Sequence, residues 1–371
     1  MKQNCTHTTL PKFSFIFMFL INILTDSSIG MTSISLMCSS NSKAVLMGYL
    51  EDELSEVKKL CEHVVAGTKL VSCVRTMVRV EIKKTVHKTI TVCAQFPEDY
   101  PNSPLLFELK SKTLSDKLLV GLTRICEQEG KKLLGKSQIL PLLKFVRKFI
   151  DENSLICCYD EINALKLILS GKDQLKLKQK SSTVVLKVYN EEYYLIGRVM
   201  VPDNYPSTAV DIQQVETNFT TPFYTHMIAQ AKEIARRCVE APLHPKPNAA
   251  PFVPIPSMEK TLLFLIDCVK RLPFEECPFC TEKCFPSDAK LLERDPNSPN
   301  HIERVYCGHV FHQGCLLEFM KQPPFGNKKC AKCGAKLYHF KWSQSDKKAE
   351  ARWAHEQARD RELQEVSDFL K

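Results

Sequence analysis

The sequence predicts an α+β protein built from two copies of one domain, followed by a small region rich in cysteine and histidine and by a helical tail. Three observations support this fold class. A Tyr-Pro motif occurs twice, at Tyr100-Pro101 and Tyr205-Pro206, with an offset of 105 residues. Segments with helical and alternating periodicity surround each motif in the same order. Eight cysteines and histidines then follow in a regular order between positions 277 and 333.

The first copy is predicted to span residues 45–153. An amphipathic helix over 50–65 precedes a strand over 88–93, and helices follow between 114 and 149. The Tyr-Pro turn at 96–101 separates the strands from these helices. Its prolines fix their own φ and hold the preceding residue extended, so the chain leaves the sheet at a defined angle.

The second copy is predicted to span residues 154–272, with the same order of elements around the turn at 201–206. A segment with six prolines, 241–256, is predicted to form a stiff extended connection within this copy. The predicted elements are a helix over 159–169, a strand over 182–188, and helices over 222–238 and 258–272.

A third region, residues 273–341, contains four pairs of metal-ligand residues. A lone Cys-x2-Cys pair is a weak sign of a metal site, but four pairs in this order strongly indicate two tetrahedral zinc sites. With every position filled by protein, such zinc is structural and activates no water. The region has few apolar residues, so the two ions must supply folding energy. The eight ligands are Cys277, Cys280, Cys307, His309, His312, Cys315, Cys330 and Cys333.

Three other residues of this region are expected to bind no metal. Cys284 follows Cys280, which already completes its pair, and Phe285-Pro286 indicates the start of a loop. That loop is rich in proline, asparagine and serine as far as residue 300 and is predicted to be exposed. His301 and His339 are expected to be surface residues.

Residues 342–371 are predicted to form a solvated helical tail, because opposite charges alternate there without proline or glycine after residue 346. Four apolar residues give this helix a weak stripe, which packs either on a partner or on its own domain. They are Trp353, Leu363, Val366 and Leu370.

Charge and cysteine usage restrict the partners and the compartment. The formal charge is +9, yet basic residues are spread along helical segments such as 131–148 without interleaved aromatics, so no nucleic-acid partner is expected. Cysteines outside the third region, such as Cys61 and Cys93, lie in apolar contexts without the spacing of a disulfide framework. This pattern indicates a reducing compartment.

The amino-terminal segment, residues 1–44, contains an uncharged apolar run over 13–24. Its length is typical of a signal-peptide core and short for the ~20 residues of a membrane span. Met31, Met37 and Met47 offer later starts, so we expect the run to be absent from the true protein, which would be cytoplasmic or nuclear. The alternative is a signal anchor that holds the protein on a membrane, facing the cytosol.

Both copies resemble the RWD domain, a relative of the ubiquitin-conjugating fold, in their order of helix, antiparallel strands, Tyr-Pro turn and helix. The first copy also resembles the conjugating enzymes in the spacing of Phe96-Pro97, Tyr100-Pro101 and Pro104. Those enzymes have His-Pro-Asn and a cysteine nucleophile soon after the turn, and neither copy has such a cysteine. The resemblance therefore implies two non-catalytic binding platforms.

The third region resembles the RING family, in the form whose ligands run three cysteines, two histidines and three cysteines. The resemblance implies a cross-braced arrangement, in which the first and third ligand pairs share one ion and the second and fourth pairs share the other. Cys277, Cys280, His312 and Cys315 would hold the first zinc ion. Cys307, His309, Cys330 and Cys333 would hold the second.

Two RWD domains followed by a RING form the architecture of the Fanconi anaemia ubiquitin ligase family, which the chain resembles over residues 45–341. The resemblance implies a RING-type ubiquitin ligase without a catalytic residue of its own, which accelerates transfer by orienting the thioester and the acceptor lysine. The RING would bind a ubiquitin-charged conjugating enzyme, and the RWD domains would hold a protein substrate or complex subunits. Phe279 and Phe319 are the expected contacts with the conjugating enzyme, although both also suit the core of a small domain.

Two positions depart from the pattern of active ligases. Ala331 replaces the proline usual after the seventh ligand, and Gly334 stands where many active members have arginine or lysine. The competing hypothesis is therefore a non-catalytic adaptor that assembles a complex. A zinc-dependent nucleic-acid binder ranks third, because basic and aromatic residues are not interleaved around the ligands.

Overall fold

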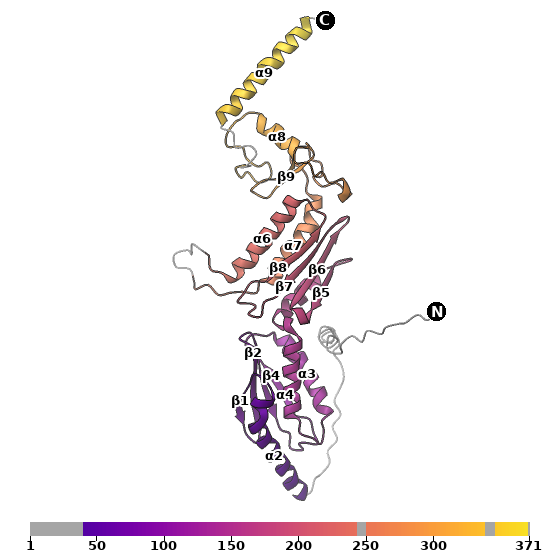
Figure 1. The fold of residues 1–371 in the computed structure, drawn as a ribbon, viewed down its shortest axis with the longest axis vertical. Helices are drawn as coiled ribbons and strands as arrows, with labels where there is room; N and C mark the ends of the chain where they lie inside the picture. The colour runs from indigo at the N-terminus through magenta and orange to yellow at the C-terminus, as the bar shows by residue number, and fades with distance from the viewer. Residues whose placement is uncertain (1–39, 243–249, 338–345, 370–371) are drawn as a thin grey trace, which may run out of the picture. The chain divides into compact units, whose positions relative to one another are not determined.

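A computed structural model of the protein describes residues 40–242, 250–337 and 346–369 (Figure 1). Helices and two four-stranded sheets confirm the α+β fold class. The chain divides into two compact units, and the dividing line crosses the second sheet. The first unit holds residues up to Leu186 with 197–214 and 232–263, and the second holds 187–196, 215–231 and the residues from Phe264 onward.

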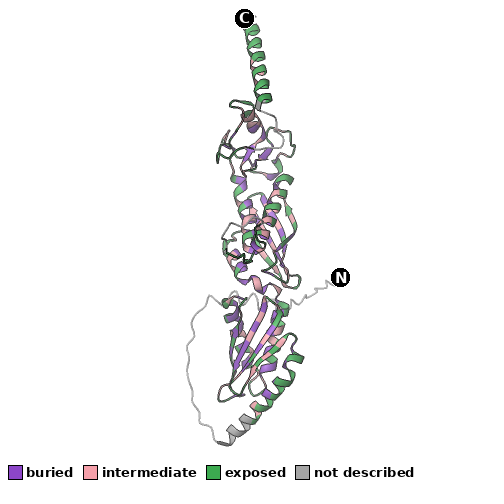
Figure 2. Ribbon diagram, turned by 90° about the vertical axis from the view of Figure 1, so that its left-hand side faces the viewer, coloured by how far each residue is buried: buried purple, intermediate pink, exposed green. Residues whose placement is uncertain are grey.

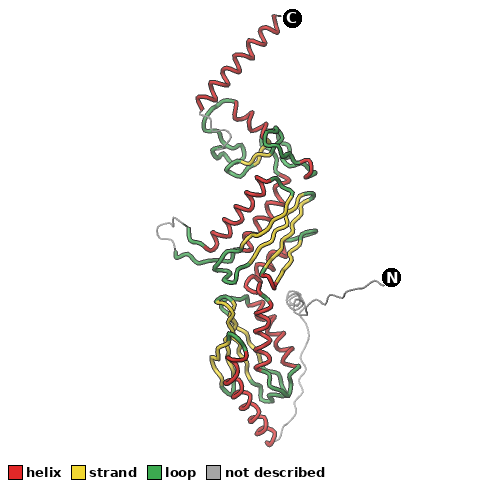
Figure 3. Tube along the Cα trace, viewed as in Figure 1, coloured by secondary structure: helices red, strands yellow, loops and turns green. Residues whose placement is uncertain are grey.

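The first sheet is antiparallel, with the strand order β1-β2-β3-β4 (Figure 3). Helix α2 (Ser40–Val64) precedes it, and helices α3 (Asp116–Lys131) and α4 (Ile139–Glu152) follow it and pack on the sheet. The strands are β1 (Thr68–Cys73), β2 (Met77–Thr85), β3 (Lys88–Gln95) and β4 (Leu106–Lys110).

The core of this part lies between the sheet and its helices (Figure 2). Alternate residues in the first part of β2 are buried, namely Val78, Val80 and Ile82, as expected for a strand with one face on a core. Helix α4 buries Val146 and Phe149 from one face. Burial of such side chains contributes about 1.5–3 kcal/mol each, so this part is stabilised mainly by apolar contacts.

Helix α2 is longer than the sequence analysis predicted. It begins at Ser40, whereas the apolar periodicity gave a helix over 50–65. The added residues include good helix formers such as Ala44 and Leu46, and no proline interrupts them, so the helix extends beyond its amphipathic part.

The same order of elements recurs after residue 153. Helix α5 (Tyr159–Ile168) precedes a sheet with the order β5-β6-β7-β8, and helices α6 (Thr221–Val239) and α7 (Met258–Arg271) follow. Residues 250–257 of the proline-rich connection form neither helix nor strand, and 243–249 lie outside the described residues. The strands are β5 (Gln174–Lys178), β6 (Thr183–Asn190), β7 (Tyr193–Met200) and β8 (Asp211–Thr217).

A buried tyrosine and glutamate connect the Tyr-Pro turn of the first copy to two helices. Tyr100 Oη donates a hydrogen bond to Glu53 of α2. The Glu53 carboxylate also accepts the N–H groups of Gln138 and Ile139, each at 2.9 Å, where α4 begins. The first turn of a helix has N–H groups without helical partners, and this carboxylate satisfies two of them.

The second copy repeats this pair with equivalent residues. Tyr205 Oη lies 2.5 Å from Glu161 of α5 and accepts the N–H groups of Ser257 and Met258 at 2.9 and 3.1 Å, where α7 begins. Glu161 accepts the N–H of Glu259 at 2.9 Å. Burial raises the pKa of both glutamates, although their hydrogen bonds oppose that shift.

The cysteine- and histidine-rich region has little regular structure. Strands β9 (Ile302–Arg304) and β10 (Val310–His312) form a hairpin, and helix α8 (Gln313–Lys321) follows directly. One 3-10 turn of this region is η5 (Ala289–Leu291). The other 3-10 turns of the described residues precede it, and they are η2 (Ser154–Cys158), η3 (Gln179–Ser181) and η4 (Leu272–Phe274).

The predicted helical tail is α9 (Asp346–Phe369), and exposed residues dominate it (Figure 2). Leu363 and Val366 are exposed, whereas the ring of Trp353 lies 6.0 Å from that of Phe325. Leu370 lies outside the described residues, as does the apolar run 13–24 of the amino-terminal segment. Of the helices described, none has the length and apolar character needed to cross a membrane.

Candidate metal centre

The first ligand pair lies in a tight turn. The N–H of Cys277 donates to Glu282 O and the N–H of Thr281 donates to Cys277 O, both at 2.8 Å. Thr281 adopts a φ of +62°, an unfavourable conformation for a β-branched residue. The turn places both sulfurs of the pair on one side.

The last ligand pair repeats this turn. The N–H of Cys330 donates to Ala335 O, and the N–H of Gly334 donates to Cys330 O, again at 2.8 Å. Gly334 has a φ of +69° and corresponds to Thr281. Glycine reaches this conformation at little cost. The backbone of the turn therefore explains why glycine stands at position 334, which the ligand spacing alone did not explain.

The four central ligands come from one hairpin and one helix. Cys307 and His309 lie in the turn between β9 and β10, His312 ends β10, and Cys315 lies in the first turn of α8. His309 in the turn and His312 at the end of β10 belong to different groups of ligands.

The structure brings the eight residues together as two groups of four. Within each group the ligand atoms all lie within 4.8 Å of one another. The first and third pairs share one group, and the second and fourth pairs share the other. The groups are Cys277, Cys280, His312 and Cys315, and Cys307, His309, Cys330 and Cys333.

The distances within the groups fit a tetrahedral ion with sulfur and nitrogen ligands. Metal bonds of ~2.3 Å to sulfur and ~2.0 Å to nitrogen place these atoms about 3.6 Å apart. The Nδ1 atom of His312 lies 3.3 Å from the sulfur of Cys280, and that of His309 lies 3.5 Å from the sulfurs of Cys307 and Cys330. Both groups can therefore hold a metal ion, with Nδ1 as the nitrogen ligand.

The two groups differ in exposure. Cys277 is buried and its three partners are half-buried, whereas Cys333 of the second group is exposed. Burial, together with neighbouring thiols, raises the pKa of Cys315 to about 12 and that of Cys307 to about 11. Burial would raise the pKa of Cys277, but backbone hydrogen bonds overcome this effect and lower it, and a backbone hydrogen bond from Ala335 lowers the pKa of Cys333. A cysteine binds a metal ion as the thiolate, so metal binding would release protons.

Glu275 connects the second group to the chain before the first ligand. Its carboxylate pairs with Arg271 of α7 and with Lys332, which stands between Cys330 and Cys333. Burial alone would raise the pKa of Glu275, but the two cations overcome this effect and lower it.

Cys284 is buried and belongs to neither group, as the spacing predicted. A loop follows at Phe285-Pro286, as predicted, and its residues 294–300 are mostly exposed, but Phe285 itself is 1% exposed. Its ring lies 5.8 Å from that of Tyr193, 5.9 Å from Phe219 and 5.2 Å from Phe223, and Tyr193 Oη donates to Pro286 O at 2.8 Å. An aromatic cluster therefore fixes the chain directly after Cys284.

Phe279 and Phe319 lie in contact. Their rings are stacked with centroids 4.7 Å apart, and Phe279 also lies 5.3 Å from the ring of Phe311. Both stacked rings are half-buried, whereas Phe311 is fully buried. Lys328 places its Nζ 4.3 Å from the centroid of Phe319. The two phenylalanines therefore form one continuous apolar surface.

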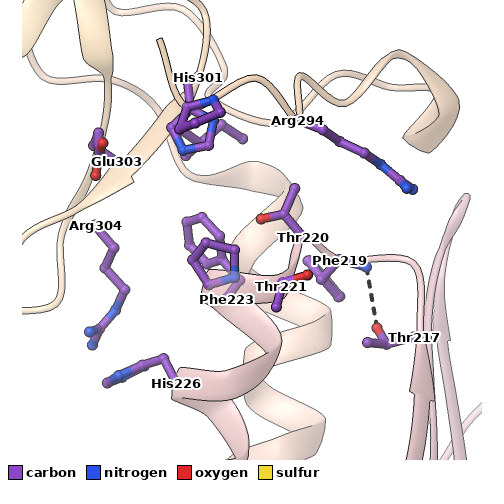
Figure 4. Close-up of a pocket in the computed structure, with 13 residues that line it drawn as sticks. Thr217, Phe219, Thr220, Thr221, Phe223, His226, Arg294, His301, Glu303 and Arg304 are labelled. Carbon is purple, nitrogen blue, oxygen red and sulfur yellow. Dashed lines mark hydrogen bonds between the residues drawn. The ribbon is translucent and has the colours of Figure 1, made fainter. Parts of the chain in front are cut away.

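The prediction that His301 is a surface residue is wrong. This residue is 7% exposed, and it lines a pocket at the start of α6 (Figure 4). Its N–H donates to Ser298 O at 3.0 Å and its carbonyl accepts the N–H of Gln313 at 2.8 Å, so the loop folds over the side chain. Its position directly before Ile302, the first residue of β9, was the only sequence signal. His339 lies outside the described residues.

Three described cysteines outside this region are poorly suited to act as nucleophiles. Cys126, Cys238 and Cys268 are buried, and burial raises the pKa of each thiol, in the case of Cys268 to about 11. A buried thiol with a raised pKa is inert, because the thiolate is the nucleophile.

The sequence model of one protein family matches part of the chain. Residues 33–150 match the RWD domain, a fold related to the ubiquitin-conjugating domain that is usually non-catalytic and mediates protein–protein interactions. This match covers the first sheet and its helices. No curated protein matches the chain.

Proposed function

We propose that the protein is a RING-type ubiquitin-protein ligase with two RWD domains, residues 45–153 and 154–272, a cross-braced RING over 273–341 and a helical tail over 342–371. One observation carries the proposal. The four ligand pairs interleave, so that pairs distant in sequence share a group while adjacent pairs do not. A chain of two independent zinc knuckles would instead pair neighbours.

Zinc is the metal that fits these groups. Each group offers three sulfurs and one imidazole nitrogen within reach of one ion, which is a structural zinc set. Because four protein atoms close each site, zinc would hold the fold and take no part in bond breaking.

The second RWD domain is supported by its likeness to the first. Both sheets have sequential strand order, each follows one helix and precedes two, and each has the tyrosine–glutamate pair at the start of the last helix. An RWD pair of this kind would hold a substrate or complex subunits. A cytoplasmic or nuclear location agrees with the free cysteines of the described ranges.

The apolar surface of Phe279 and Phe319 is the proposed contact with the conjugating enzyme. Both rings remain half-exposed after packing on each other, so they are available to a partner. No residue of the chain would form a covalent intermediate. Transfer would be accelerated because the charged conjugating enzyme and the acceptor lysine are held in a reactive orientation.

A non-catalytic adaptor remains the second candidate, and Gly334 is the observation that favours it. Its left-handed backbone suits glycine, and no heavy atom lies within 4 Å of a Cβ built there. Gly334 therefore contributes no side chain to a bound conjugating enzyme, at a position where many active ligases have a cation. Ala331 is the other departure.

An ubiquitination assay tests the proposal. The protein is incubated with ubiquitin, activating enzyme and a panel of conjugating enzymes. We expect Phe279→Ala to keep two zinc ions and to slow chain formation about tenfold or more, because loss of a buried aromatic anchor costs about 2 kcal/mol of binding.

Two cysteine variants are the controls. Cys277→Ser should lose one zinc ion by native mass spectrometry and abolish chain formation, whereas Cys284→Ser, at a buried cysteine outside both groups, should keep both ions. If the wild-type protein forms no chains with any conjugating enzyme but still binds its partner proteins, the adaptor function replaces the ligase.

A further inference from the structure

A groove lies between strand β4 and helix α3, within the first compact unit. Its volume is about 700 Å³. The consecutive residues 107–111 line one wall of it. Because successive side chains of a strand point to opposite faces, a groove that touches all of them runs along the edge of the strand and not over one face of the sheet.

The edge of β4 that borders this groove is open. β4 is the last strand of the sheet, and in the described part of the chain it is hydrogen-bonded to β3 alone. No backbone hydrogen bond joins residues 106–110 to any other described segment. Free N–H and C=O groups at the edge of a sheet form a template for another strand, unless the side chains oppose pairing.

Helix α3 forms the other wall of the groove with one side of its surface. Its lining residues recur at intervals of three and four, which is the spacing of one stripe along a helix. They are Asp116, Leu119, Val120, Thr123, Arg124 and Glu127.

Helix α3 runs back along β4. It follows the strand after residues 111–115 and packs against it, so the two elements have opposite directions (Figure 1). Leu109, one residue before the end of β4, is therefore roughly level with Val120, one turn into α3. Both residues line the groove.

The charges on β4 permit pairing with a second copy of the strand in one register. Glu108 and Lys110 stand on either side of Leu109, and both are 59% exposed. A two-fold axis at Leu109 would place Glu108 of each copy opposite Lys110 of the other, so opposite charges meet twice. An axis at Glu108 would place two like charges opposite each other. The ion pair that Glu108 and Lys110 form within one strand, at 3.0 Å, is exposed and contributes little that pairing would lose.

Helix α3 is complementary to itself in the same way. Asp116 and Arg124 lie four residues before and after Val120, and neither has an ion pair or hydrogen bond among the described residues. A two-fold axis at Val120 would bring Asp116 of each copy to Arg124 of the other, and Val120, which is 48% exposed, to its own copy. An axis between residues 121 and 122 would instead bring Asp116 to Glu127, which has the same charge.

We infer that this groove is the interface of a symmetric dimer, in which a second copy of the chain pairs its β4 with β4 and its α3 with α3. One two-fold axis perpendicular to the sheet can pass between both pairs, because Leu109 and Val120 lie at one level. The open edge then gains hydrogen-bond partners, and the opposite charges select the register. The dimer does not depend on ligase activity, and the eight metal-ligand residues belong to the other compact unit.

Sedimentation velocity on the full-length, metal-loaded protein tests the dimer. The wild type should show a dimer whose fraction rises with protein concentration. Asp116→Arg and Arg124→Asp should each weaken dimerisation about a hundredfold, because symmetry places like charges opposite each other at two positions. An equimolar mixture of the two variants should dimerise as the wild type does, since the two arginines of one variant face the two aspartates of the other.

A control variant and a second measurement locate the interface. Lys144→Glu reverses an exposed charge on α4 outside the groove and should leave dimerisation unchanged. Amide hydrogen exchange should show protection of β4 that rises with protein concentration. Protection of β1, the opposite edge of the same sheet, should not change.

Three results would overturn the inference. A wild type that stays monomeric at high micromolar concentration leaves the groove to a strand of a different protein. A dimer that both charge reversals leave intact has its interface elsewhere. A mixture of the two variants that does not dimerise shows that their loss of association does not come from charge pairing. None of these results alters the proposed ligase assay, whose variants lie outside this groove.

Discussion

The first sheet with its helices and the cysteine- and histidine-rich region hold their structure by different means. Over residues 50–152, apolar side chains from α2, four strands and two further helices form one core. Over 276–337 the regular elements are two strands of 3 residues and one helix of 9 residues, besides one turn of 3-10 helix. Their buried apolar residues, including Val305, Phe311 and Leu316, are few. Hydrophobic burial is sufficient for the first part, whereas the second buries little apolar surface, and we propose that metal ions held by its two groups supply the remaining folding energy.

The largest predicted effect is the loss of structure on metal removal. A strong chelator should unfold residues 276–337, because metal binding of this kind supplies about 10–16 kcal/mol of folding free energy. Amide hydrogen exchange read by mass spectrometry should show loss of protection at β9, β10 and α8, with β2 and β3 unchanged. Added zinc should restore protection. If the chelator leaves the amide protection of β10 unchanged, the two parts do not differ in their dependence on metal.

The next effect concerns the tyrosine–glutamate pairs. Tyr100→Phe and Tyr205→Phe should each lower the free energy of unfolding by about 1–3 kcal/mol, because a buried carboxylate loses its hydroxyl donor. Urea unfolding measures the change, and both variants should keep two metal ions. Tyr194→Phe is the control, since its hydroxyl makes only a 3.4 Å contact with Glu216 at the surface, and it should change stability by less than about 0.5 kcal/mol. Loss of metal from the Tyr100→Phe variant would show that the cysteine- and histidine-rich region depends on the first sheet and its helices.

The smallest predicted effect is that the stability of the first part and that of the metal groups change in opposite directions with pH. The pKa values of Glu53 and Glu161 are raised in the folded protein, so the stability that they contribute is greatest below their unfolded pKa near 4.5 and is lost as pH rises through the folded values. The metal groups respond in reverse, because falling pH returns protons to their thiols and imidazoles.

Amide exchange at several pH values can follow both parts at once. Between pH 4.5 and neutral, protection of β2 and β3 should fall slightly as pH rises, while that of β10 should increase. Glu53→Gln should flatten the first dependence and leave the second unchanged. Exposed Glu216→Gln is the control. A parallel response of β2 and β10 would show that the two parts do not differ in this way.

The sequence alone determined the order of the elements and the eight residues that the structure brings together as two groups of four. Ligand spacing is a local property, and cysteine and histidine in such pairs have few other uses, so the order of residues along the chain is enough to identify them. The repeated Tyr-Pro motif likewise placed two similar folds along the chain. Helix α2 exceeded its prediction because its first residues, such as Ala44 and Leu46, favour a helix and no proline interrupts them.

Only the tertiary structure decided which residues become buried far from their sequence neighbours. It placed Phe285 against Tyr193, Phe219 and Phe223, stacked Phe279 on Phe319, and buried His301 beside the start of α6. None of these contacts joins residues that are close along the chain. The sequence reports what a side chain is, but burial depends on which distant groups fold over it, and that choice is made by packing of the whole unit.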